Sequence, residues 1–322
     1  MSLFRAQAFG TSLGQVGSGL QLAVLRIVVG VHLLTVFGSP VLPLLASVGA
    51  HPHPMTSSAI PAALEALVPA EEMPLLGGVG MLAACAMIAG LFTRAAIVLA
   101  LLAFLITQNY WFRSTVFHDD WLYLVFPLLT LACSDCADRL ALDARLRKRS
   151  PRRGAQRQAY RWPLELIASW FAFVYVSAGV AKLFPLRKGV LWLSGRSVQQ
   201  FAVEFLPDSP IFWLTGHSLF DYRLVWPFCI ASWLTALVEL SAGAMIFLPR
   251  ARWVFWLALL GMHVGIWCMG IPGFVQLALV FAIAMLPVEL FRDAAAVPIS
   301  EAKPALDVAQ RFTYDAPAQQ PK

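Results

Sequence analysis

Charged residues are scarce in this sequence of 322 residues. Asp, Glu, Lys and Arg together make up 13% of the chain, against roughly 25% in a typical soluble domain. A soluble fold needs charge on its exterior, so this scarcity excludes an ordinary soluble enzyme. Aromatic residues, by contrast, include 11 Trp and 22 Phe, which excludes a disordered chain. With 59% hydrophobic residues, the composition predicts a multi-pass integral membrane protein in contact with the lipid bilayer.

Eight apolar stretches have the composition of membrane-spanning helices. A bilayer core about 30 Å thick requires about 20 apolar helical residues. The stretches are 20–38, 75–92, 95–110, 120–134, 163–181, 225–248, 253–270 and 272–291. We therefore expect an all-α polytopic helical bundle over residues 20–291, between a cytoplasmic segment 1–19 and a flexible cytoplasmic tail 292–322.

The basic residues predict the orientation of this bundle. Nine Lys or Arg residues lie in the segment 139–162, and loops rich in such residues stay in the cytoplasm. Counting outward from that loop places both termini in the cytoplasm and the segments 39–74 and 182–224 outside. The net charge of +6 is then a signal of topology. A nucleic-acid partner is the weaker interpretation, because no soluble basic domain is present. We expect a bacterial-type cytoplasmic (inner) membrane, and the oligomeric state stays open.

Cysteine is also rare, with five residues scattered along the chain. Only Cys133-Ser-Asp-Cys136 has a recognisable spacing, and neither a βαβ pattern nor a second pair accompanies it. The end of a helix on the reducing side is therefore favoured over a redox pair. A metal site is not predicted, because nothing links His51-Pro-His53 to His118-Asp-Asp120 in another outer loop.

The ionisable groups predicted to lie within or beside the spans are few. A charge at the centre of a membrane helix costs at least about 2.5–3.5 kcal/mol, so such residues mark candidate sites. They are Arg26, His32, His118, Asp119, Asp120, Glu165, Lys182, Glu239 and His263. The topology places His118, Asp119, Lys182 and His263 toward the outer face. Arg26 and Glu239 are interpreted as a pair between helices, and His263 either as a satisfied interhelical hydrogen bond or as a functional group.

Lys182 follows the segment Tyr175-Val-Ser-Ala-Gly179-Val-Ala. Helical spacing puts Tyr175, Ala178 or Gly179, and Lys182 on one face. The small residues there allow another helix or a flat ligand to approach the backbone. Position alone favours a lysine that reaches from the helix end to the lipid headgroups. The competing interpretation is a partly desolvated lysine that acts as a base.

Three groups of residues, in order along the chain, carry a resemblance to a known family. They are His118-Asp-Asp-Trp121; Phe173 to Leu183, with Tyr175, Gly179 and Lys182, followed by Trp192-Leu-Ser-Gly195; and Glu239-Leu-Ser-Ala-Gly243 followed by Met262-His263. Together they resemble the membrane part of the vitamin K-dependent γ-glutamyl carboxylase family, the horizontally transferred transmembrane (HTTM) domain, over about residues 20–290. His118 is shifted by one position from the histidine of the family pattern.

The resemblance implies an enzyme that acts on reduced vitamin K or another membrane quinol. Lys182 matches the base that deprotonates the quinol, and His263 matches a histidine that can hydrogen-bond a quinol oxygen. Tyr175, Gly179 and Trp192 would line the cofactor site, together with His118 and Asp119. In the family, O2 then converts the quinol to an epoxide through a strongly basic species. That species removes a γ-proton from a glutamate, and CO2 adds to the carbanion.

The resemblance implies a reaction on a quinol more directly than it implies carboxylation of a peptide. The animal carboxylases carry a large lumenal domain that holds the glutamate substrate, and only the outer segments 39–74 and 182–224 stand in its place here. A secreted or outer-face peptide therefore remains one of several possible substrates. Two alternatives stay open: a quinone-dependent oxidoreductase or peptide-maturation component, and a non-catalytic transporter or scaffold. The lack of inverted repeats or paired broken helices speaks against transport.

Overall fold

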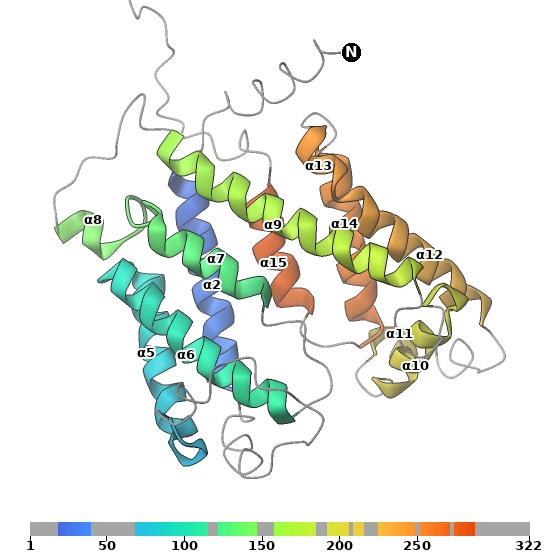
Figure 1. The fold of residues 1–322 in the computed structure, drawn as a ribbon, viewed down its shortest axis with the longest axis horizontal. Helices are drawn as coiled ribbons and strands as arrows, with labels where there is room; N and C mark the ends of the chain where they lie inside the picture. Colours follow the sequence, from blue (N-terminus) through green and yellow to red (C-terminus); the bar gives the residue numbers. More distant parts are fainter. Residues whose placement is uncertain are drawn as a thin grey trace, which may run out of the picture. The chain divides into compact units, whose positions relative to one another are not determined.

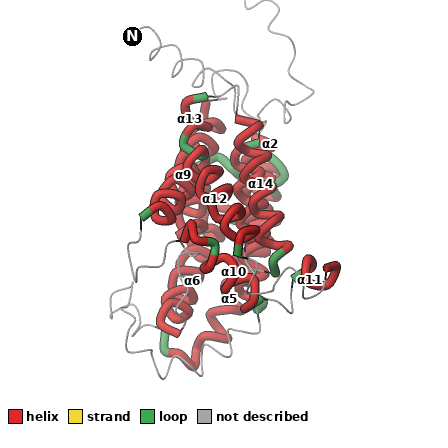
Figure 2. Tube along the Cα trace, turned by 90° about the vertical axis from the view of Figure 1, so that its right-hand side faces the viewer, coloured by secondary structure: helices red, strands yellow, loops and turns green. Residues whose placement is uncertain are grey.

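The computed structural model describes residues 19–39, 68–114, 122–146, 158–184, 192–205, 209–215, 225–248, 252–270 and 274–286. All of them belong to one unit of the chain. Regular structure within these ranges is entirely helical (Figures 1 and 2), which confirms the all-α prediction. The predicted N-terminal segment 1–19, apart from Gly19, and the predicted tail 292–322 lie outside the described residues.

The longer helices follow the predicted apolar stretches. Each of the eight stretches overlaps a helix of the structure, although the bounds differ by several residues. These helices are α2 (Gly19–Phe37), α5 (Met73–Ala89), α6 (Thr93–Ser114), α7 (Leu122–Cys133), α9 (Gln158–Leu183), α12 (Trp226–Ser241), α14 (Arg252–Cys268) and α15 (Phe274–Met285). Short helices connect or extend them: η1 (Ala70–Glu72), α8 (Leu142–Leu146), η4 (Trp192–Ser194), α10 (Arg196–Glu204), α11 (Pro210–Thr215) and α13 (Ala244–Phe247).

The apolar helices are those of a membrane protein. Three segments in the described part of the chain are long and apolar enough to cross a bilayer: Gly19–Phe37, Ala159–Leu183 and Trp226–Phe247. Shorter apolar helices accompany them over Met73–Ala89, Thr93–Gln108, Tyr123–Cys133 and Trp253–Cys268. Large apolar side chains such as Phe173, Trp233 and Trp267 are about half exposed or more, as expected where lipid rather than water covers the surface.

Helix α2 packs against α5, α15 and α9, and glycine allows its closest approach to α5. A Cβ atom at Gly30 would lie 2.6 Å from Ile88 Cγ1, and one at Gly80 would lie 2.7 Å from the Phe37 ring. Small residues at such crossings bring helix backbones together, which strengthens van der Waals packing in a membrane. The core that results includes the fully buried Phe104, Phe171 and Phe281.

Arg26 lies in this core and does not pair with Glu239, so that prediction is wrong. Its guanidinium donates hydrogen bonds to the carbonyl oxygens of Cys136 at 2.8 Å and Leu140 at 2.5 Å. The segment after α7 leaves its carbonyls outside a helix, and the buried guanidinium offers enough donors to satisfy several of them. The hydrogen bonds of Arg26 therefore link α2 to the α7–α8 connection.

Asp143, in α8, completes the same end of the bundle. Its carboxylate accepts hydrogen bonds from the Phe92 and Thr93 backbone N–H groups at 3.0 and 2.8 Å. It also accepts one from the Thr93 hydroxyl at 2.9 Å. The first N–H groups of a helix lack partners within the helix. The Asp143 carboxylate, although distant in the sequence, therefore supplies the acceptors that a capping side chain would give to the N-terminus of α6.

Candidate functional site

Helices α9 and α12 approach closely at Gly179. A Cβ atom there would lie 3.0 Å from Leu240 Cγ and backbone N, and 3.1 Å from Glu239 Cβ. These distances leave no room for a larger side chain without movement of one helix. The small-residue face predicted around Lys182 is thus occupied at Gly179 by a second helix.

Glu239 is the counter-ion of Lys182. Three residues beyond Gly179, the Lys182 ammonium donates to both carboxylate oxygens of Glu239, each at 2.5 Å. The side chains are 17% and 7% exposed, so the charges are largely removed from solvent. In a low dielectric the attraction between two opposite charges is strong. It offsets the cost of removing both charges from water only when the geometry and hydrogen bonds of the pair are good, as they are here. In this structure the Lys182 ammonium therefore bonds to the neighbouring helix α12.

Trp192 contributes an aromatic face to the same place. Its ring centroid lies 5.2 Å from Lys182 Nζ, within the range of a cation–π interaction. The ring belongs to η4, which is attached to α12 by a hydrogen bond from Cys229 Sγ to the Leu193 carbonyl at 3.2 Å. Gly195 turns the chain there with φ +77°, and a Cβ atom at this position would clash with the Cys229 nitrogen. Helix α12 therefore positions both Glu239 and, through η4, Trp192.

Tyr175 and His263 form a second polar contact, deeper along α9. Tyr175 Oη lies 2.6 Å from His263 Nε2 of α14, and the phenol donates when that nitrogen is unprotonated. Both side chains are buried, and Phe281 of α15 packs edge-on against Tyr175 with ring centroids 5.2 Å apart. His263 thus makes the interhelical hydrogen bond that was one of its two expected roles.

The structure brings some predicted site residues together and separates others. Lys182, Trp192 and Glu239 make one cluster, hereafter the lysine cluster. Tyr175 lies seven residues before Lys182, about 10 Å along the helix axis, and holds His263 there. His118 and Asp119 lie outside the described residues.

Glu239 is the functional candidate that sequence reasoning undervalued. It was interpreted as part of the scaffold, paired with Arg26. An acid in a membrane helix requires a partner of opposite charge, but in the sequence both Arg26 and Lys182 meet that requirement.

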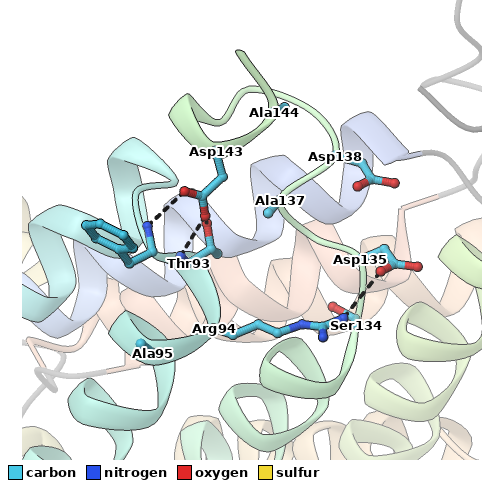
Figure 3. A pocket seen from close by; sticks show the side chains of 10 residues that line it. Thr93, Arg94, Ala95, Ser134, Asp135, Ala137, Asp138, Asp143 and Ala144 are labelled. Atoms are coloured by element: carbon cyan, nitrogen blue, oxygen red, sulfur yellow. Dashed lines mark hydrogen bonds and ion pairs between the residues drawn. The ribbon is translucent and has the colours of Figure 1, made fainter. Parts of the chain in front are cut away.

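A pocket of about 530 Å³ lies at a different part of the bundle, beside the start of α6. Its lining includes Arg94, Asp135 and Asp143 (Figure 3). The carboxylate of Asp143 accepts the α6 hydrogen bonds described above, and Asp135 pairs with Arg94 at 3.4 Å. Of the residues predicted for the quinol site, those that the structure describes do not line this pocket. Within the described ranges, no group of three or more His, Cys, Asp or Glu side chains is arranged to hold a metal ion.

The Cys133–Cys136 motif lies at the end of α7 and the connection after it, beside this pocket. Both thiols are free, and Cys136 is buried and donates to the Leu131 carbonyl at 3.4 Å. Burial raises the pKa of the Cys136 thiol, which opposes formation of the thiolate needed for redox or metal chemistry. The helix-end interpretation of this motif fits that environment.

The lysine cluster is therefore the candidate functional site. It joins a buried acid, an amine and an aromatic ring from α12, α9 and η4 within the apolar part of the bundle. Comparisons of the chain with descriptions of protein families, with curated proteins and with solved structures find no match in any of the three.

Proposed function

We propose that the chain is an eight-span membrane enzyme that binds a reduced membrane quinone at the lysine cluster and deprotonates it with Lys182. Both termini would lie in the cytoplasm and the cluster near the outer face of an inner membrane. The single observation that carries the proposal is the buried Lys182–Glu239 pair beside the Trp192 ring. It places a proton-accepting amine, a proton-holding acid and a flat apolar surface together.

The ion pair can supply a neutral amine without an external base. Lys182 Nζ lies 2.5 Å from both Glu239 oxygens, so a proton can move from the ammonium to the carboxylate along an existing hydrogen bond. In a low dielectric the neutral amine and acid avoid the desolvation penalty of two charges. The Lys182 lone pair is then available to accept a proton from a hydroxyl, while Glu239 holds the first proton.

The residues present fit a quinol. Trp192 offers a flat ring of the kind that stacks on another aromatic ring. Its indole Nε1 is buried and has no hydrogen-bond partner among the described residues, so it can donate to a ligand oxygen. A bound quinol would supply acidic hydroxyl groups and, once deprotonated, an electron-rich ring that reacts with O2. The proposal covers this quinol step; carboxylation with CO2 is a separate activity.

The test compares Lys182→Gln with the unchanged protein in proteoliposomes. Supplied with 2-methyl-1,4-naphthohydroquinone and O2, the unchanged protein should form the 2,3-epoxide, and Lys182→Gln should lose at least about 100-fold of that rate, a typical effect of removing a general base. Glu165→Gln is the matched control, because Glu165 lies near the other end of the same helix, in an ion pair with Arg161 at 3.2 Å.

Each result decides between the candidate functions. Equal epoxide formation by Lys182→Gln and the unchanged protein would contradict the assignment of the base. Quinone reduction without an epoxide would favour an oxidoreductase instead. Incorporation of labelled CO2 into an added glutamate-containing peptide would extend the proposal to carboxylation.

A further inference from the structure

Helix α11 is short and exposes large apolar side chains. It has six residues, Pro210–Thr215, and a length of about 9 Å at 1.5 Å per residue, which is too short to cross a bilayer. Trp213 is 77% exposed and Leu214 is 86% exposed. Ile211 and Phe212, in the first turn, are only partly exposed. The helix therefore packs against the protein near its start and presents two large apolar side chains outward.

Ser209 fixes the position of this helix. It is completely buried, and its hydroxyl accepts a hydrogen bond from the Phe212 N–H at 3.2 Å, as an N-cap serine does. The same hydroxyl donates to the carbonyl of Cys268, the last residue of α14, at 2.9 Å. The last carbonyls of a helix have no partner within that helix. One side chain therefore joins the start of α11 to the end of α14.

The end of α14 lies at the same level of the bundle as the start of α12. Met269, directly after α14, packs against the small apolar cluster that contains Phe228, a residue in the first turn of α12. Two tryptophans mark this level: Trp267 is 50% exposed and Trp226, the first residue of α12, is 64% exposed. Exposed tryptophans gather where a bilayer meets water. The joint between α14 and α11 is therefore at the level of the lipid headgroups.

Helix α10, which precedes α11, has a different exposed side. One face of α10 is buried in the protein. Arg196, Gln200 and Glu204 follow one another at intervals of four residues, which places them together, and all three are exposed. Such a polar row is suited to water, whereas Trp213 and Leu214 are suited to hydrocarbon. Two neighbouring short helices thus favour different surroundings.

We propose that α11 lies in the membrane interface, with Trp213 and Leu214 inserted among the lipids of the leaflet that the end of α14 reaches. In the proposed topology this is the outer leaflet. The surface of α14 beside it is apolar and exposed, with Val264 at 52% and Trp267 at 50%, and α11 contacts α14. The apolar side of α11 therefore continues a surface that lipid covers. Interfacial helices bury such a side about 5–10 Å into the boundary between headgroups and acyl chains.

A photoreactive side chain tests which molecule covers α11. The variant Leu214→p-benzoylphenylalanine of the full chain is reconstituted in vesicles of phosphatidylglycerol and phosphatidylethanolamine and irradiated. We expect mass spectrometry of the intact protein to show a gain of one phospholipid mass. The same replacement at Val264 is the lipid-facing reference and should give the same adduct. The same replacement at Gln200, exposed on α10, is the matched control and should give none.

The other results would overturn the inference. Lipid adducts at Leu214 that are no more frequent than at Gln200 would place α11 in water. Cross-linking of two chains through Leu214 would mean that a second copy covers the helix. Trp213→p-benzoylphenylalanine gives the same comparison if the Leu214 variant does not fold. No quinone is present, so the result is independent of the proposed function.

Discussion

Removing either partner of the Lys182–Glu239 pair should destabilise the protein far more than removing both. The two side chains are 17% and 7% exposed and share two hydrogen bonds of 2.5 Å. A single substitution leaves one charge in the apolar bundle without its counter-ion, which typically costs about 3–5 kcal/mol of unfolding free energy. Lys182→Met should be the more harmful single change, because Glu239 is the more buried partner. The double variant Lys182→Met/Glu239→Leu should return to within about 1 kcal/mol of the unchanged protein.

The assay is denaturant unfolding in mixed micelles, followed by tryptophan fluorescence, with all four members of the double-mutant cycle. Asp135→Ala is the control, because it removes an ion pair whose Arg94 side chain is 68% exposed, and it should cost about 1 kcal/mol or less. Additive effects of the two single variants would contradict this prediction, since they would mean that the partners do not stabilise each other. The double variant should remain inactive toward a quinol even when its stability is restored, which separates the chemical role of the pair from its structural one.

Further predictions concern the crossing of α9 with α12 and the opposite end of the bundle. Gly179→Ala adds a methyl group 3.0 Å from Leu240, so it should displace α12 and lower the free energy of unfolding by about 1–3 kcal/mol. The free energy of quinol binding should fall by more than this amount. An unchanged quinol affinity would contradict the role of this crossing. Asp143→Ala removes three accepted hydrogen bonds and should cost about 2–4 kcal/mol in thermal unfolding, and a loss below 1 kcal/mol would show that water replaces the carboxylate. In inside-out vesicles at pH 7, a membrane-impermeant maleimide should label the exposed Cys133 and spare Cys136, whose thiol pKa is raised by burial. Equal labelling rates would contradict this burial, and labelling of Cys133 only in right-side-out vesicles would reverse the proposed topology.

The helices were largely predictable from the sequence because their signal is local. A run of apolar residues specifies a membrane helix without reference to the rest of the chain, and each predicted stretch overlaps a helix. The face shared by Tyr175, Gly179 and Lys182 follows from helical spacing in the same way. Helix α9 extends from Gln158, five residues before the predicted start at 163, and Pro163 lies inside the helix.

The partners of the polar residues were not predictable, because they depend on which helices are neighbours. Arg26 and Glu239 are opposite charges in apolar stretches, and pairing them was reasonable from composition. In the structure Arg26 reaches the carbonyls after α7, whereas Glu239 lies across from Gly179. The absence of a side chain at Gly179 sets the approach of α9 to α12, and that approach determines which acid meets Lys182.

We propose above that Lys182 removes a proton from a bound quinol. The most direct measurement is the ultraviolet absorption spectrum of 2-methyl-1,4-naphthohydroquinone bound to the protein at pH 7 without oxygen, which distinguishes the hydroquinone from its anion. We expect an anion spectrum on the unchanged protein and on Glu165→Gln, and a neutral spectrum on a Lys182→Gln variant that still binds the probe. A neutral spectrum on the unchanged protein, or the same anion spectrum on Lys182→Gln, would contradict it.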